Sequence, residues 1–148
     1  MNQHPYLRAY MAGIAVPTMM LLVILSAFLI ARYVFQIPIP IERAIVFPMA
    51  LVPNIFGAWN IFYLWLRPRP HLPIGFHGAI LPFLLAPAGL ALASCSGFLS
   101  TTSSGLLWFS AVAVPYALLA IGFPLALIAY YLVWKYLVGF FNAVLGIA

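Results

Sequence analysis

Four long apolar stretches alternate with short runs of prolines and polar residues along this chain. They cover residues 10–35, 41–66, 74–94 and 115–137. Each is close to the roughly 20 apolar residues that an α-helix needs to cross a membrane. Because four such helices and their loops account for nearly all of the sequence, we expect one transmembrane domain over residues 1–148. The predicted fold is all-α, a polytopic integral membrane four-helix bundle.

The most polar run lies at the centre of the chain, at residues 67–73, where the sequence reads Arg-Pro-Arg-Pro-His-Leu-Pro. Proline fixes φ and lacks a backbone N–H, so a helix does not continue through this run. We therefore predict a short cytoplasmic loop that joins two transmembrane hairpins.

Prolines also lie within the predicted spans or at their ends. They are Pro17, Pro48, Pro53, Pro82, Pro87, Pro115 and Pro124. Because proline bends a helix, we expect proline-kinked transmembrane helices with a crevice between them. We expect Asn54, Phe56 and Trp59 of the second span to line this crevice, which would suit an isoprenoid or acyl chain with a polar head.

Two segments do not fit a single straight span. Residues 106–137 are one apolar stretch, which as a helix would be roughly 48 Å long. Pro115 divides it, so we expect residues 106–114 to form an interfacial or re-entrant piece before the fourth span. Residues 139–148 are apolar and amphiphilic, and we expect them to lie on the membrane surface.

Charge is scarce. Only 5% of the residues are charged and 67% are hydrophobic, whereas a soluble domain carries about 25% charged residues. Lipid must therefore surround most of this chain. The net charge of +5 comes from only six scattered basic residues, most of which flank apolar stretches. This placement indicates membrane topology and headgroup contact rather than nucleic-acid binding.

The basic residues also predict an orientation, because cytoplasmic loops carry an excess of Lys and Arg. Four of them fall on the side of the two termini: Arg8, Arg67, Arg69 and Lys135. Arg32 and Arg43 fall on the opposite side, next to Glu42. Four against two favours cytoplasmic N- and C-termini.

Residues that carry chemistry are few. Cys95 is the one cysteine, which excludes an internal disulfide and a multi-cysteine metal motif. His4, His71 and His77 all fall on the predicted cytoplasmic side, so a haem or metal site inside the membrane is disfavoured. Glu42, the one acidic residue, begins the second span, where an ion pair with its neighbour Arg43 is expected. We predict no catalytic and no metal-binding residue.

Asn54 is the most conspicuous polar residue within a span, directly after Pro53. A carboxamide at that depth needs a hydrogen bond from another helix or to a carbonyl that a proline leaves free, here that of Met49. We interpret Asn54 as a structural residue at the interior of the bundle, with ligand contact as the alternative. Small residues at 89, 93 and 97, and at 122 and 126, predict close helix packing within the chain or with a second copy.

These observations favour a non-catalytic small membrane protein, either an accessory or assembly subunit or a lipid-binding helical bundle. Its expected partners are membrane lipid and a second copy or a larger membrane complex, with no cofactor. The alternative is a membrane enzyme or carrier for a lipophilic substrate with an anionic head at the cytoplasmic interface, with a quinone or lipid as cofactor. The candidate ligand-binding residues are Asn54, Trp59, Arg67, Arg69, His71 and His77.

Overall fold

The computed structural model describes residues 4–45, 47–69 and 72–147, apart from the side chains of residues 43, 47 and 48. Within these residues, four helical stretches are long and apolar enough to cross a membrane: Pro5–Tyr33, Met49–Leu66, Ile74–Cys95 and Tyr116–Val144. The prediction of a mostly helical, multi-pass membrane protein is thereby confirmed.

The first and third helices agree with the sequence. Helix α1 covers Pro5–Tyr33 and α4 covers Ile74–Cys95. Helix α1 begins earlier than predicted because Pro5 suits the first turn of a helix, where its missing N–H would be unpaired in any case. Pro17, Pro82 and Pro87 lie inside these two helices without ending them.

The second span is shorter than residues 41–66. Helix α2 is a single turn at Ile41–Ala44, and the π-helical turn η1 (Phe47–Leu51) leads into α3 (Val52–Leu66). Pro53 lies in the first turn of α3, where a missing N–H is tolerated, and the backbone is helical from η1 through Leu51 into α3. The candidate span consequently begins at Met49.

The last span is longer than residues 115–137. Helix α5 (Tyr116–Leu132) continues through the π-helical turn η2 (Val133–Val138) into α6 (Gly139–Val144). The expectation that residues 139–148 lie on the membrane surface is wrong for the described part, because α6 packs against α1 and Ile147 is buried there.

Residues 106–114, predicted as an interfacial or re-entrant piece, lie in two strands and the turn between them, and these strands were not predicted. Strands β1 (Leu99–Thr101), β2 (Gly105–Trp108) and β3 (Val112–Pro115) make a small antiparallel sheet in that order. β-Branched and aromatic residues favour strands over helix in this short apolar run. The polar turn before β2 is closed by Thr102, whose hydroxyl accepts a hydrogen bond from the Gly105 N–H at 3.1 Å.

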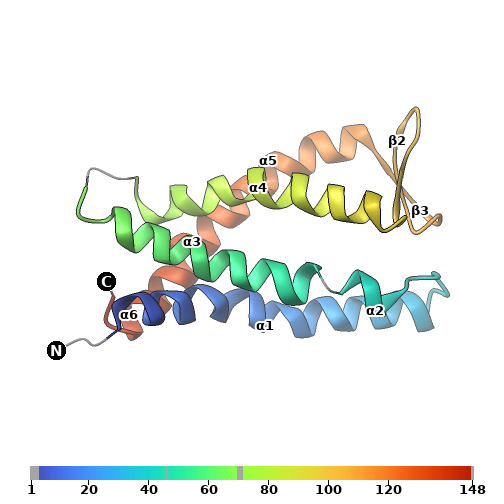
Figure 1. The fold of residues 1–148 in the computed structure, drawn as a ribbon. Coiled ribbons are helices and arrows are strands. Elements are labelled where there is room, and N and C mark those ends of the chain that lie inside the picture. Colours follow the sequence, from blue (N-terminus) through green and yellow to red (C-terminus); the bar gives the residue numbers. More distant parts are fainter. Residues whose placement is uncertain (1–3, 46, 70–71, 148) are drawn as a thin grey trace.

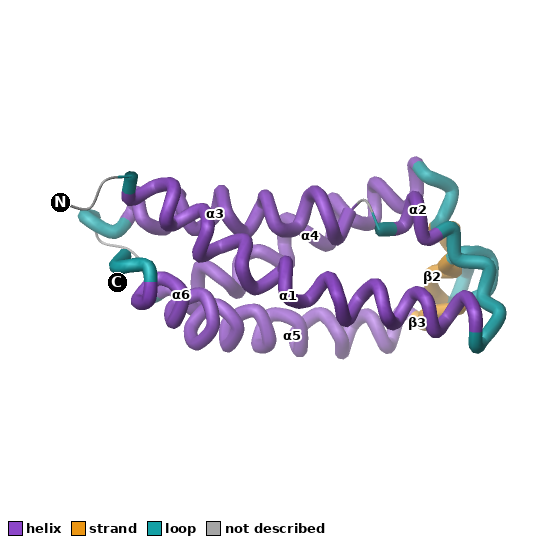
Figure 2. The backbone as a smooth tube through the Cα atoms, turned by 90° about the horizontal axis from the view of Figure 1, so that it is seen from below, coloured by secondary structure: helices purple, strands orange, loops and turns teal. Residues whose placement is uncertain are grey.

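The helices form two hairpins (Figure 1). Helix α1 packs along α3, and α4 packs along α5, whereas α3 and α4 touch much less although a short loop joins them. The last helix crosses from the second hairpin to the first, because η2 contacts both α4 and α1 and α6 contacts α1. Figure 2 shows both termini at one end of the molecule and the sheet at the other.

Large and very small residues meet where η2 crosses between the hairpins. Trp134 and Val138 are fully buried and belong to the same apolar cluster as Phe56 and Leu81. Gly78 of α4 lies against the indole, since a Cβ at this position would be 2.4 Å from the Trp134 Cβ. The core therefore lies at this crossing, on the side of the termini.

Candidate ligand-binding cavity

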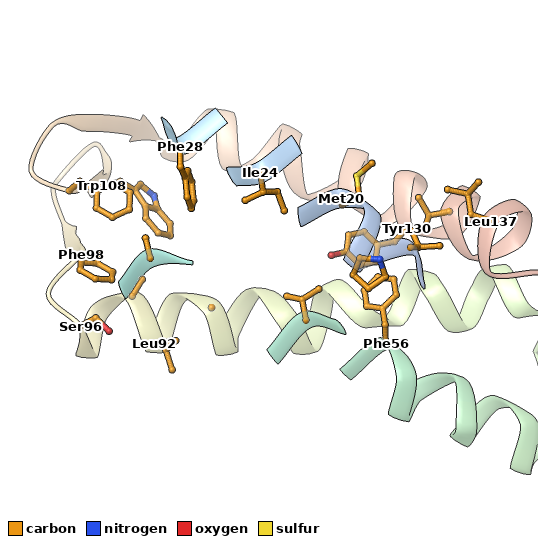
Figure 3. Close-up of a pocket in the computed structure, with 18 residues that line it drawn as sticks. Met20, Ile24, Phe28, Phe56, Leu92, Ser96, Phe98, Trp108, Tyr130 and Leu137 are labelled. Carbon is orange, nitrogen blue, oxygen red and sulfur yellow. The ribbon is translucent and has the colours of Figure 1, made fainter. Parts of the chain in front are cut away.

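A cavity of about 670 Å³ lies between the two hairpins, on the side of the core that faces the sheet (Figure 3). Its walls come from α1, α2 and α3 on one side and from α4, α5 and η2 on the other. Trp108 at the end of β2 and its neighbours Phe98 and Phe109, which flank the strands, line the outer end of the cavity. The hairpins are joined at the crossing of η2, whereas the sheet packs against α4 and α5 of the second hairpin. The cavity lies between this crossing and the sheet end of the molecule.

The wall formed by α1 has helical periodicity. Residues three or four positions apart share one face of a helix. The α1 residues that line the cavity are Val16, Pro17, Met20, Ile24 and Phe28. From Val16 to Phe28 the helix rises by roughly 18 Å, so the cavity follows more than half of the roughly 30 Å hydrocarbon core of a bilayer.

The lining is almost entirely apolar. Among the 18 described residues that line the cavity there is no Asp, Glu, Lys, Arg or His. Hydroxyl and indole groups come from Ser96 and Trp108 at the sheet end and from Tyr130 at the opposite end, near Phe56. The cavity therefore suits a long apolar molecule that carries few polar atoms.

The turn that closes the sheet end has an unusual backbone. Phe109 and Ser110 both have positive φ, 52° and 56°, a left-handed conformation that is uncommon for a bulky residue. The Phe109 N–H donates to the Phe98 carbonyl at 2.8 Å, and the two rings lie 5.4 Å apart. This turn directs an aromatic pair to the outer end of the cavity.

Asn54 joins the two helices of the first hairpin but does not line the cavity. Its side-chain oxygen accepts a hydrogen bond from the Tyr10 hydroxyl, and its amide donates to the Ala50 carbonyl at 2.5 Å. The predicted interhelical hydrogen bond is therefore present. The carbonyl is that of Ala50 rather than Met49, and Asn54 is exposed on the protein surface, so its predicted interior position is wrong.

Trp59 and His77, both candidates from the sequence, meet at the contact of α3 with α4. The Trp59 indole N–H donates to the His77 carbonyl at 2.9 Å. The His77 ring is buried and lies 5.1 Å from the Tyr63 ring, edge to face. This cluster is also outside the cavity lining, so of the three residues expected to line a crevice only Phe56 does so.

The candidate arginines lie at the end of the molecule that holds the termini. The Arg67 guanidinium donates to the Ile147 carbonyl, and Arg8 donates to the Leu145 carbonyl at 3.3 Å. Arg69 lies over the Trp65 ring at 4.4 Å. Two cations thus bind carbonyls that follow α6, where the negative end of the helix dipole favours them. The candidate His71 lies outside the described residues.

Glu42 forms an ion pair across the turn between α1 and α2. Glu42 forms an exposed ion pair with Arg32 at 3.2 Å, near the outer end of the cavity because Phe28 and Ala44 line it. The side chain of Arg43, the predicted partner, lies outside the described part. Exposed pairs of this kind contribute little to stability.

Sequence reasoning missed the buried pair of Asn60 and Asn142. Each amide donates to the oxygen of the other, at 2.7 and 3.2 Å, and Asn60 also donates to the Ala9 carbonyl at 2.7 Å. Three segments, α1, α3 and α6, are joined by these bonds. The available signal was a second carboxamide within an apolar stretch, because such groups need partners there.

Some of the small residues line the cavity, and another allows two helices to pack closely. Gly89 and Ala93 line the cavity, and an added Cβ at Gly122 would meet no atom of the chain within 4 Å. The close packing of these rows with a second copy stays a prediction. Gly13 allows the closest approach of α1 to α3, where a Cβ would lie 2.5 Å from the Phe56 carbonyl oxygen.

Comparison of the chain with protein-family models, with curated proteins and with solved structures found no match. Within the residues that the structure describes, no group of three or more His, Cys, Asp or Glu side chains is placed to hold a metal ion.

Proposed function

We propose that this chain is a non-catalytic membrane protein that holds a lipid or a similar long apolar molecule between its two hairpins. The cavity supports this proposal. Its volume of about 670 Å³ falls in the range of roughly 300–1,000 Å³ that is usual for ligand sites. Its apolar walls follow the direction of the spans, and an acyl or isoprenoid chain lies in this direction within a bilayer.

The proposed orientation places both termini in the cytoplasm. The positively charged Arg8, Arg67 and Arg69 lie at the end of the molecule that holds the termini, whereas Arg32 lies at the sheet end. The excess of basic residues on cytoplasmic loops supports this orientation. The cavity then opens toward the outer half of the membrane.

Membrane lipid is the first partner in this proposal, and a second copy or a larger membrane complex is the other. The open position beside Gly122 on α5 supports a protein partner, because a small residue lets another helix approach closely.

The alternative, an enzyme or carrier that binds an anionic head at the cytoplasmic interface, has less support. Arg67 donates to a backbone carbonyl, Arg69 is stacked on Trp65, and Trp59 donates to the His77 backbone. These side chains are thus used in contacts within the chain. Other residues line the cavity, and among the described lining residues there is no Lys, Arg or His.

Native mass spectrometry of gently extracted protein tests the proposed function, with a variant that fills the cavity. Ala93 is buried and lines the cavity, whereas Ala91 on the same helix is exposed and does not. We expect the wild type and Ala91→Phe to retain one lipid-sized molecule, and Ala93→Phe to lose it. Absence of a bound molecule from the wild type, or equal retention by the two variants, would contradict the proposal.

A further inference from the structure

The charge of the lining restricts the head of the bound molecule. Among the described residues, no ionisable side chain other than the Tyr130 phenol lines the cavity. Moving an ion out of water into such surroundings costs several kcal/mol unless a partner neutralises it. Arg32 and Glu42, near the outer end, are already paired with each other. An uncharged head avoids this cost.

The positions of the polar groups indicate where such a head lies. The Ser96 hydroxyl both donates and accepts, and the Trp108 indole donates only. Neither side chain has a hydrogen-bond partner among the described residues, and both lie at the sheet end of the cavity (Figure 3). Each of these groups can donate a hydrogen bond to an acceptor oxygen, such as that of an alcohol or a carbonyl, at this end of the cavity.

The length of the cavity fits one leaflet. A chain beginning at the sheet end and running along α1 from Phe28 to Val16 covers roughly 18 Å, and one half of the hydrocarbon core is roughly 15 Å thick. The sheet end corresponds to the ends of the spans, where the polar heads of lipids lie. Head and tail of an amphiphile thus match the polar and apolar parts of the cavity.

We infer that the cavity selects a lipid with an uncharged, hydrogen-bonding head, placed beside Ser96 and Trp108, and with one apolar chain directed toward Phe56. The shared chemistry is an acceptor oxygen on a long chain, which either a free alcohol or an isoprenoid quinone supplies. This inference rests on the function proposed above, since it needs the cavity to hold a lipid at all.

Probes with the same chain and different heads test the inference. The protein in phosphatidylcholine nanodiscs is incubated with hexadecanol, with hexadecyl sulfate, or with a benzoquinone that carries an alkyl chain of matched length. Native mass spectrometry then counts the bound probe. We expect hexadecanol or the quinone to be retained at least about tenfold more than the sulfate, a ratio that corresponds to about 1.4 kcal/mol. The better retained of the two identifies the source of the acceptor oxygen.

Two serine variants test the placement of the head. Ser96→Ala is expected to lower retention of the preferred probe about fivefold, as for one neutral hydrogen bond. Ser94→Ala, on the same helix but outside the lining, is the matched control and should leave retention unchanged. Loss of retention in Tyr130→Phe but not in Ser96→Ala would place the head at the opposite end and overturn the inference.

These outcomes also distinguish failure of the inference about the head group from failure of the proposed lipid-binding function. Equal retention of the sulfate and the neutral probes, with Ala93→Phe losing both, overturns head-group selection and leaves lipid binding standing. If the wild type and Ala93→Phe retain all probes equally, or neither retains any, both the inference and the proposed function are wrong.

Discussion

At the scale of single residues, three asparagines show how carboxamides are accommodated in apolar helices. Asn54 is exposed and bonds to Tyr10 and to its own helix. Asn60 and Asn142 are buried and bond to each other. Sequence alone predicts that each amide needs a partner, because an unpaired amide is costly in lipid. It does not identify the partner, since Asn142 is 82 positions from Asn60 and no local pattern links them.

We expect Asn60→Leu and Asn142→Leu each to lower the free energy of unfolding by about 0.6–2 kcal/mol, as for an interhelical hydrogen bond. The remaining amide would be left buried without its partner, so the double variant should lose less than the sum of the single losses. Denaturation of the detergent-solubilised protein measures all three values. Asn54→Leu, whose amide is exposed, is the control and should have a smaller effect. Strict additivity would show that the two amides do not interact.

At the scale of the elements, the helices were predictable and their ends were not. Apolar length indicates a span, so α1 and α4 agree closely with residues 10–35 and 74–94. The strands within residues 106–114 were not predicted, because periodicity does not separate a short apolar helix from a strand. There the decisive contribution is pairing between strands, such as Leu106 opposite Val114, which no single segment contains.

The contact of α1 with α3 depends on a position without a side chain. We expect Gly13→Ala to destabilise the protein by about 1–3 kcal/mol, the usual effect of overpacking, because the new Cβ would meet the Phe56 backbone and not a movable side chain. Gly122→Ala is the matched control. It meets no atom within 4 Å and should be neutral or stabilise α5 by up to about 1 kcal/mol through helix propensity. Thermal unfolding in detergent compares the two, and equal stabilities would argue against close packing at Gly13.

At the scale of the whole molecule, the arrangement of the hairpins could not be predicted from the sequence. Four spans and a central loop are readable from apolar stretches and prolines. The cavity is not, because it depends on α3 and α4 diverging and on η2 crossing to α1. Two of the predicted crevice residues, Asn54 and Trp59, were placed on the correct span and on the wrong faces of it. Which faces of two helices pack together depends on contacts between residues far apart in the chain, such as Gly78 with Trp134.

Cysteine labelling tests the orientation of the molecule in the membrane. In a Cys95→Ser background, we expect Thr102→Cys to react with a membrane-impermeant maleimide on intact spheroplasts, and Arg69→Cys to react only after permeabilisation. The reason is the excess of basic residues at the end that holds Arg69. The reverse pattern of labelling would place both termini outside.

The binding of α6 to the first hairpin has a consequence for biosynthesis. Arg8 and Asn60 belong to the first two spans and Arg67 directly follows the second. The groups they bind, at Asn142, Leu145 and Ile147, are synthesised about 80 residues after Arg67. The first hairpin is therefore synthesised before these groups exist. Its polar contacts with α6 and the residues after it form only once α6 has been synthesised.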